Sequence, residues 1–282
     1  MPVFAGWSFR EDDLRHQAAL YLRLISIQIR SQMQYRVSFW LELFSTGLLN
    51  ASYFIALVFV LERFDNIMGW TLGEVAFLAG MVEMSFAVMD MIFSGFDAGS
   101  FSRLVRMGAF DQMLLRPVSI TLQVFGSQFE LRRLGRVLEG MVIFIVAMSL
   151  NPLHWTLAKL LYFPVVFASQ VIAFGSLFVM GSTLTFWTVE PVEAVNILTY
   201  GGNELMTYPA TIYPTWLQRF FTFVVPLIFL NYFPALFFLD KTDPLGFPDF
   251  TPFLAPAAAL VMIGLAAWFW QFGVNHYQST GS

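Results

Sequence analysis

The stretch LLYFPVVFASQVIAFGSLFVMGSTLTFWTV, residues 160–189, contains no Asp, Glu, Lys or Arg. A helix needs about 20 mainly apolar residues to cross the hydrocarbon core of a bilayer, and this run is longer than that. Residues 220–239 and 250–275 are two further runs without a charged side chain. The three runs predict an integral membrane protein.

The composition of the whole chain agrees with this prediction. Of its 282 residues, 57% are hydrophobic and only 12% are charged, whereas a soluble domain carries about 25% charged residues. The chain has no cysteine, which excludes disulfide scaffolds, cysteine zinc sites and thiol catalysis. The apolar runs do not alternate with polar residues as the strands of a membrane β-barrel do. We therefore predict an all-α, polytopic membrane protein.

Six transmembrane helices are predicted, and only the fifth is ambiguous. The other five candidates are residues 37–61, 72–96, 137–150, 160–189 and 250–275. The fifth is either 220–239 or a more polar stretch, 191–208. Residues 190–213 contain three glutamates and no Lys or Arg, which is unusual for a cytoplasmic loop, and two prolines interrupt 220–239. We favour 191–208 as the fifth span, with residues 214–240 as a re-entrant segment before the last one.

The basic residues predict the orientation. Most of the 15 Lys and Arg residues lie in residues 1–36 or between the second and third spans, and such residues favour the cytoplasmic side. We expect a cytoplasmic tail at 1–36, a transmembrane domain at 37–275 and a cytoplasmic tail at 276–282. Within the first tail, an amphipathic helix at the membrane surface is expected, with its arginines facing lipid headgroups or a cytoplasmic partner. These arginines are Arg15, Arg23 and Arg30.

Several catalytic motifs are absent. The chain has no GxxxxGK[ST] phosphate loop and no HExxH zinc motif. We expect no catalytic residue, no bound metal and no cofactor in this chain, so that any ATP-driven activity requires a separate subunit. The basic residues are not gathered into a block of the kind that binds nucleic acid.

The loop between the second and third spans reads GSFSRLVRMGAFDQMLLRPVS, residues 99–119. It resembles the Gly-x-hydrophobic-Asp-x-x-Leu-Leu-x-Pro loop found in a family of membrane (permease) subunits of type-2 ABC exporters. The matching residues are Gly108, Asp111, Leu114, Leu115 and Pro117. Further stretches fit the same family: YPATIYP at 208–214, followed by 225–226 and 232–235, and the C-terminal YQSTGS at 277–282.

The resemblance implies a dimer of two such subunits, identical or homologous, with six spans each, in the bacterial plasma (inner) membrane. It also implies cytoplasmic ABC ATPase subunits, which bind ATP and Mg and dock on a coupling loop at about 98–118. We expect the docking residues to be Arg103, Arg106, Gly108, Asp111, Leu114, Leu115, Arg116 and Pro117. The arginines have a second interpretation, in which they only hold the topology. The family does not settle the substrate.

Acidic residues recur within the second span. Glu83, Asp90 and Asp97 are seven residues apart and so share one helical face. Ionisable groups inside a membrane are costly and mark a pathway or a partner. On the fifth span, polar residues at steps of three or four also share a face. The pathway candidates are Glu83, Asp90, Asn196, Tyr200 and Asn203. The alternative is that these groups pair across helices and hold the bundle together.

The leading hypothesis is a permease subunit without a catalytic centre, moved by a separate ATPase. The apolar and aromatic surroundings of the acidic face favour an amphiphilic or lipid-like substrate. The alternative is a proton- or ion-coupled secondary transporter in which Glu83 and Asp90 titrate. A membrane enzyme is a third possibility, but the sequence offers no credible nucleophile–base pair.

Overall fold

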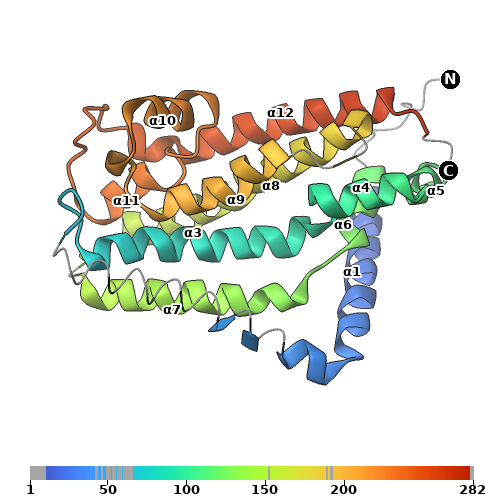
Figure 1. Cartoon of the computed structure of the whole chain (residues 1–282), viewed down its shortest axis with the longest axis horizontal. Coiled ribbons are helices and arrows are strands. Elements are labelled where there is room, and N and C mark those ends of the chain that lie inside the picture. Colours follow the sequence, from blue (N-terminus) through green and yellow to red (C-terminus); the bar gives the residue numbers. More distant parts are fainter. Residues whose placement is uncertain are drawn as a thin grey trace.

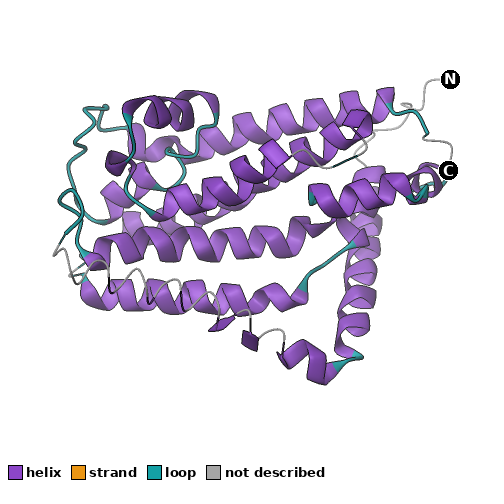
Figure 2. Ribbon diagram, in the orientation of Figure 1, coloured by secondary structure: helices purple, strands orange, loops and turns teal. Residues whose placement is uncertain are grey.

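The computed structural model describes residues 11–41, 66–151, 153–188, 190 and 193–279, with scattered positions between 44 and 59. Within these ranges the chain is helical and forms no strand (Figure 2). The helices are α1 (Glu11–Met33), α3 (Leu72–Phe93), α4 (Ala98–Arg106), α5 (Ala109–Leu114), α6 (Ile120–Ser127), α7 (Leu134–Leu150), α8 (Leu157–Thr188), α9 (Glu193–Thr207), α10 (Thr215–Arg219), α11 (Tyr232–Phe238) and α12 (Ala255–His276).

Among the described helices, α3, α7, α8, α9 and α12 run side by side and form a bundle (Figure 1). Helix α3 packs against α7, α8 and α9, and α12 packs against α8. The short helices α4 and α5 lie at one end of this bundle, which we call the α5 end, and α10 and α11 lie at the other, the α10 end. Helix α1 crosses the α5 end roughly at right angles to the bundle.

Local sequence signals explain how α3 begins and how closely it packs. Thr71 caps the helix, and the Glu74 side chain accepts a hydrogen bond from the Thr71 backbone N–H in return. Farther along, a Cβ atom on Gly80 would lie 2.7 Å from the backbone of Phe144 in α7. Only a residue without a side chain permits this approach, which is typical of helix packing in membranes.

The outer surface of the bundle is apolar. Three described helical stretches are long and apolar enough to cross a membrane: Leu72–Arg106, Leu157–Thr188 and Thr251–His276. Exposed aromatic side chains lie near both ends, Trp187, Trp268 and Phe272 at the α5 end and Trp216 and Phe250 at the α10 end. Aromatic residues at two levels are typical of membrane–water interfaces. The structure therefore supports an all-α protein with several membrane-crossing helices.

The predicted spans correspond to helices wherever the structure describes them. Residues 72–96 form α3 and the 3-10 turn Ser94–Phe96, 137–150 lie in α7, 160–189 largely in α8, and 250–275 in the turn Thr251–Leu254 and α12. Most of the first predicted span, 37–61, lies outside the described residues. Helix α6 was not expected as a separate element.

The two alternatives for the fifth span differ in continuity. Residues 193–207 form one helix, α9, whereas 220–239 comprise the π-turn Phe220–Val224, a non-helical stretch and the short α11. Buried amides hold the non-helical stretch in place. The Gln170 amide donates to the Leu230 carbonyl at 2.9 Å and to the Asn231 side chain at 3.0 Å. Asn231 in turn donates to the Met206 carbonyl of α9 at 2.8 Å. Irregular backbone at membrane depth requires such internal partners.

Helix α1 is attached to α6 and to the connection that follows it. Its Tyr21 ring packs edge-on against Phe125 of α6, at 6.5 Å between centroids. Arg23 and Arg30 are exposed. Two apolar residues of the same helix are exposed as well, Leu22 by 65% and Ile27 by 61%. The side chain of Arg15 lies outside the described part of the chain.

Candidate functional site: the loop helices and a charged band inside the bundle

The expected coupling loop consists of two short helices joined by a tight turn. Asp97 caps the first of these, α4, by accepting a hydrogen bond from the Ser100 backbone N–H at 3.0 Å. Gly108 lies between α4 and α5 with a φ of +66°. Residues with a side chain rarely adopt this left-handed conformation. The backbone of the turn therefore explains why the loop pattern has a glycine at this position.

The inner faces of α4 and α5 are packed against the long helices through aromatic rings. Phe101 of α4 and Phe110 of α5 are fully buried. The Phe186 ring of α8 lies 5.3 Å from Phe101 and 5.1 Å from Phe110, between centroids. Trp270 of α12 lies 5.6 Å from Phe101. Since close-packed side chains transmit displacement, a movement of the loop helices would reach the ends of α8 and α12.

The outer face of the same helices is apolar and exposed. Met107 is 77% exposed, Leu115 is 86% exposed and Leu114 is 40% exposed. We call these three residues the docking tip. The exposed residues around it are Arg103, Arg106, Arg116 and Pro117. Arg106 forms an ion pair with Glu190 at 3.0 Å between Nη1 and Oε1, and both side chains are largely exposed.

The C-terminal tail closes over α5. The Ser279 hydroxyl donates a hydrogen bond to the Asp111 carboxylate at 2.8 Å. The Tyr277 ring packs against Phe110, at 4.9 Å, and Phe186, at 5.2 Å between centroids. Burial, assisted by the nearby Asp111 carboxylate, raises the pKa of Tyr277 to about 12. Two stretches on which the family resemblance rests, the loop and the tail, are thus in contact, and Asp111 faces this chain's own tail.

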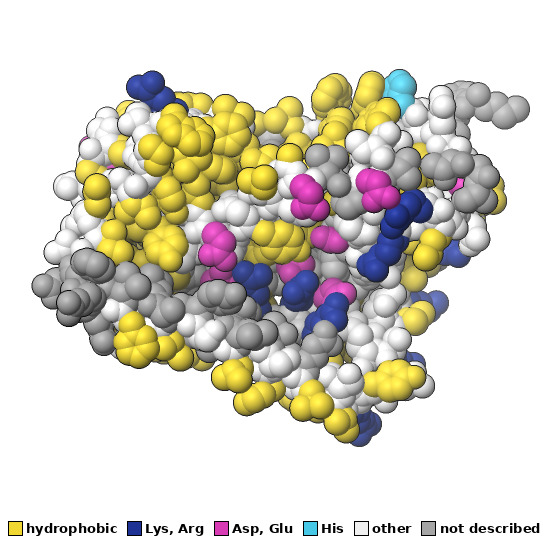
Figure 3. Space-filling view, viewed as in Figure 1, with side chains coloured by type: hydrophobic (Ala, Val, Ile, Leu, Met, Phe, Trp, Pro, Cys, Tyr) yellow, Lys and Arg dark blue, Asp and Glu magenta, His cyan; other side chains and the backbone are white. Residues whose placement is uncertain are grey.

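A band of charged side chains crosses one face of the bundle around a hollow (Figure 3). Its centre is Glu83 of α3. Oε2 of this carboxylate lies 2.7 Å from Nε of Arg136 in α7, and its Oε1 accepts a hydrogen bond from the Asn203 amide of α9 at 2.9 Å. The structure thus joins two of the predicted pathway residues, Glu83 and Asn203, through direct contact.

The other acidic residues of the band also face arginines. Asp90 is 2% exposed, and its Oδ2 lies 2.9 Å from Arg133 Nε, an ion pair without the angle of a hydrogen bond. Glu130 pairs with Arg132. Three carboxylates therefore face three arginines, and Glu204 adds a further negative charge near Glu83 and Arg136. All three arginines lie between the second and third predicted spans, but in the structure Arg136 lies within α7 and the other two immediately precede it.

The remaining pathway candidates, Tyr200 and Asn196, lie on α9 together with Asn203, but their surroundings differ. Tyr200 packs against Phe86 of α3 at 5.5 Å and Phe178 of α8 at 6.0 Å between centroids. Asn196, one turn away from Tyr200, donates instead to the Glu193 side chain of its own helix at 3.0 Å. Among the described residues, the Asn196 amide thus takes no part in the contact between Glu83 and Asn203. Sequence reasoning missed Arg133 and Arg136 as the partners of Asp90 and Glu83. Their spacing of three residues was the available signal, because it places them on one helical face.

Comparison with known proteins agrees with this architecture. A family model described as ABC-2 family transporter protein matches residues 48–281. No curated protein and no solved structure matched the chain. Because the family match covers most of the chain, the protein belongs to the ABC-2 family of transporter proteins, as a permease component of an ABC transporter. Membership implies that it works together with an ABC ATPase.

Proposed function

We propose that the chain is a six-span permease subunit of an ATP-driven exporter in the bacterial plasma membrane. The α5 end and both termini lie in the cytoplasm, where separate ATPase subunits bind ATP and Mg and dock on the docking tip. The chain itself contributes no catalytic residue and binds no cofactor or metal. A second permease subunit, identical or homologous, completes the transporter.

The exposed docking tip is the observation that carries this proposal. Met107, Leu114 and Leu115 present apolar surface to solvent, and apolar side chains surrounded by charge are typical of protein contact sites. The inner face of the same helices contacts α8 and α12 through Phe101 and Phe110. A bound ATPase that moves on ATP binding would push on the tip and displace the ends of these two helices.

The charged band supports a substrate route along α3 and α9. A route for an amphiphile requires apolar surface beside polar groups. Here the ion pair of Glu83 and Arg136 borders the rings of Phe86 and Tyr200. The route would lie between two permease subunits, with the re-entrant segment 214–240 closing it at the outer side. We infer an amphiphilic or lipid-like substrate.

The alternative, a proton-coupled secondary transporter, receives less support from the geometry. Its two titrating groups, Glu83 and Asp90, are both engaged by arginines, Arg136 and Arg133. A proton carrier must exchange its proton with the route, whereas these carboxylates are held as cross-helix ion pairs.

Co-purification tests the proposal. The variant Leu115→Asp places a charge on the docking tip without touching the packed inner face, so it is expected to lose the co-expressed ATPase subunit while the permease stays folded. Trp216→Asp, at a residue that is 68% exposed at the α10 end, is the matched control and should retain the ATPase. Equal recovery of the ATPase with both variants would contradict docking at the tip.

A further inference from the structure

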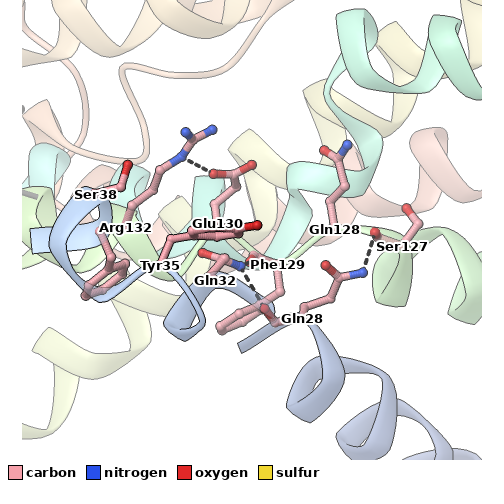
Figure 4. Close-up of a pocket in the computed structure, with 10 residues that line it drawn as sticks. Gln28, Gln32, Tyr35, Ser38, Ser127, Gln128, Phe129, Glu130 and Arg132 are labelled. Carbon is pink, nitrogen blue, oxygen red and sulfur yellow. Dashed lines mark hydrogen bonds and ion pairs between the residues drawn. The ribbon is translucent and has the colours of Figure 1, made fainter. Parts of the chain in front are cut away.

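A cavity of about 410 Å³ lies between α1 and the connection from α6 to α7 (Figure 4). Its size falls within the range of small-molecule sites, about 300–1,000 Å³. It is separate from the docking tip, and it adjoins the charged band through the Glu130–Arg132 pair. Its lining includes Tyr35, Ser38, Phe39, Phe129, Glu130 and Arg132.

The walls of the cavity are held in place by side-chain amides of α1. Gln28 donates to the Ser127 carbonyl at 2.8 Å. Gln32 accepts from the Leu131 backbone N–H at 3.0 Å and donates to the Phe129 carbonyl. Figure 4 shows both glutamines reaching from α1 toward this connection. Because each amide is tied to backbone on the opposite wall, the cavity is preformed.

The position of the cavity relates it to the membrane surface. Helix α1 lies at the α5 end and runs across the direction of the helices that are long enough to span (Figure 1). A helix in this orientation, at the end of the spans, lies in the plane of the membrane at the level of the headgroups. Ser38 and Phe39, on the cavity wall, begin the first predicted span. The cavity thus lies where a lipid headgroup meets the first apolar residues.

The chemistry of the lining is two-sided. Glu130 and Arg132 form an ion pair at one wall, and the pair keeps partial access to solvent, with side chains 21% and 42% exposed. Tyr35 and Phe129 add aromatic rings. A guanidinium binds phosphate oxygens through charge-assisted hydrogen bonds, while a carboxylate beside aromatic faces attracts an ammonium group.

We propose that this cavity binds the headgroup of a zwitterionic phospholipid of the ethanolamine type. The phosphate lies against Arg132, and the ammonium group lies against Glu130 and the aromatic rings. A phosphate that binds Arg132 competes with Glu130 for this arginine. The ammonium group of a zwitterionic lipid replaces the arginine at Glu130, whereas an anionic lipid brings no such replacement. The bound lipid would fasten α1 to the α6–α7 connection. This site depends on the membrane setting of the chain and not on ATPase docking, so either can fail without the other.

Native mass spectrometry of the purified protein tests the site. The detergent-solubilised full-length chain is incubated with equimolar phosphatidylethanolamine and phosphatidylglycerol, and retained lipid is counted. The wild type should retain phosphatidylethanolamine preferentially. Arg132→Gln removes the phosphate contact and Ser38→Trp fills the cavity without changing charge, so each should lower the retained phosphatidylethanolamine by roughly tenfold, as expected for the loss of one charge-assisted contact.

Matched controls separate this site from general lipid adhesion. Arg219→Gln and Ser149→Trp make the same changes at exposed positions of α10 and α7, and both should retain lipid as the wild type does. Equal retention by Ser38→Trp and the wild type would overturn the proposal, as would equal retention of the two lipids. Soluble glycerophosphoethanolamine is the last arm. If it binds and the intact lipid does not, the site takes a free phosphate ester and the lipid assignment is wrong.

Discussion

At the scale of single residues, the carboxylates that the sequence singles out inside the bundle have partners. Glu83 contacts both Arg136 and Asn203, on two different helices. Glu83 and Asp90 are seven residues apart, which places them on one face of a helix. This could be predicted because helical periodicity depends only on residues close together in the sequence. Their arginines could not be assigned from the sequence, because a partner on another helix depends on how the helices pack. Arg133 and Arg136 were therefore read as part of a basic loop.

The Glu83–Arg136 pair should stabilise the fold strongly. Its two side chains are only 19% and 15% exposed, so removing one partner leaves a charge in a poorly solvated place. Arg136→Gln is expected to lower the free energy of unfolding by about 3–5 kcal/mol, measured by denaturant unfolding in detergent micelles. The double variant Glu83→Gln/Arg136→Gln should recover most of this loss. A double variant as unstable as the single one would show that the charges are not coupled.

An exposed ion pair provides the comparison. Arg106 and Glu190 are 46% and 67% exposed, and solvent screens such pairs to about 0–1 kcal/mol. Glu190→Gln should therefore change the free energy of unfolding by less than about 1 kcal/mol. A loss as large as that of Arg136→Gln would mean that burial is not what distinguishes the two pairs.

A substitution of Asp90 distinguishes a role in the substrate route from a role in the stability of the fold. Asp90→Asn keeps the shape of the side chain but removes the charge that faces Arg133. Because Asp90 is 2% exposed, we expect a clear loss of thermal stability. If the band also lines the route, substrate-stimulated ATPase activity of the assembled transporter should change as well. A variant that loses stability but transports at the wild-type rate would restrict Asp90 to a structural role.

At the scale of elements, the apolar runs predicted the helices well and the interruptions poorly. Helices α8 and α12 follow from uncharged runs, since the composition of one segment decides whether it can cross a bilayer. The non-helical stretch before α11 could not be predicted in this way, because contacts between residues distant in sequence hold it. It is held by Gln170 and Asn231, which meet across about sixty residues of sequence. Prolines indicated that this segment breaks, but not what satisfies its backbone.

The loop and the tail should behave as one element. Tyr277→Ala removes the ring that packs on Phe110 and Phe186, so amide hydrogen exchange of residues 109–114 should become faster. Tyr277→Phe keeps the ring and should exchange nearly as the wild type does. Unchanged exchange in Tyr277→Ala would show that α5 is held by its other contacts alone.

The proposed re-entrant segment, 214–240, can be tested with a cysteine, since the chain has none of its own. Thr215→Cys lies on α10, at an exposed position. In intact cells it should react with a membrane-impermeant maleimide added from outside. Labelling only after the membrane is opened would place α10 in the cytoplasm and would reject the segment 214–240 as an outer re-entrant structure.

At the scale of the whole molecule, the two ends of the bundle have different surfaces. The α10 end is closed by ion pairs of both lysines, Lys159 with Asp240 at 2.6 Å and Lys241 with Glu74 at 2.8 Å. The α5 end carries exposed apolar residues on helices that also contact α8 and α12. The lysines of the α10 end are thus engaged within the chain, whereas the α5 end has the exposed apolar surface that a partner could contact.

Site-directed crosslinking in native membranes tests the central claim most directly. Leu115→Cys is expected to form a crosslink to an ABC ATPase subunit, identified by mass spectrometry, because it lies on the most exposed part of the docking tip. Trp216→Cys at the α10 end should form none. A crosslink from Leu115→Cys to the ATPase that changes with ATP is the predicted result. Absence of an ATPase adduct at Leu115→Cys, with the transporter intact and active, would contradict the account.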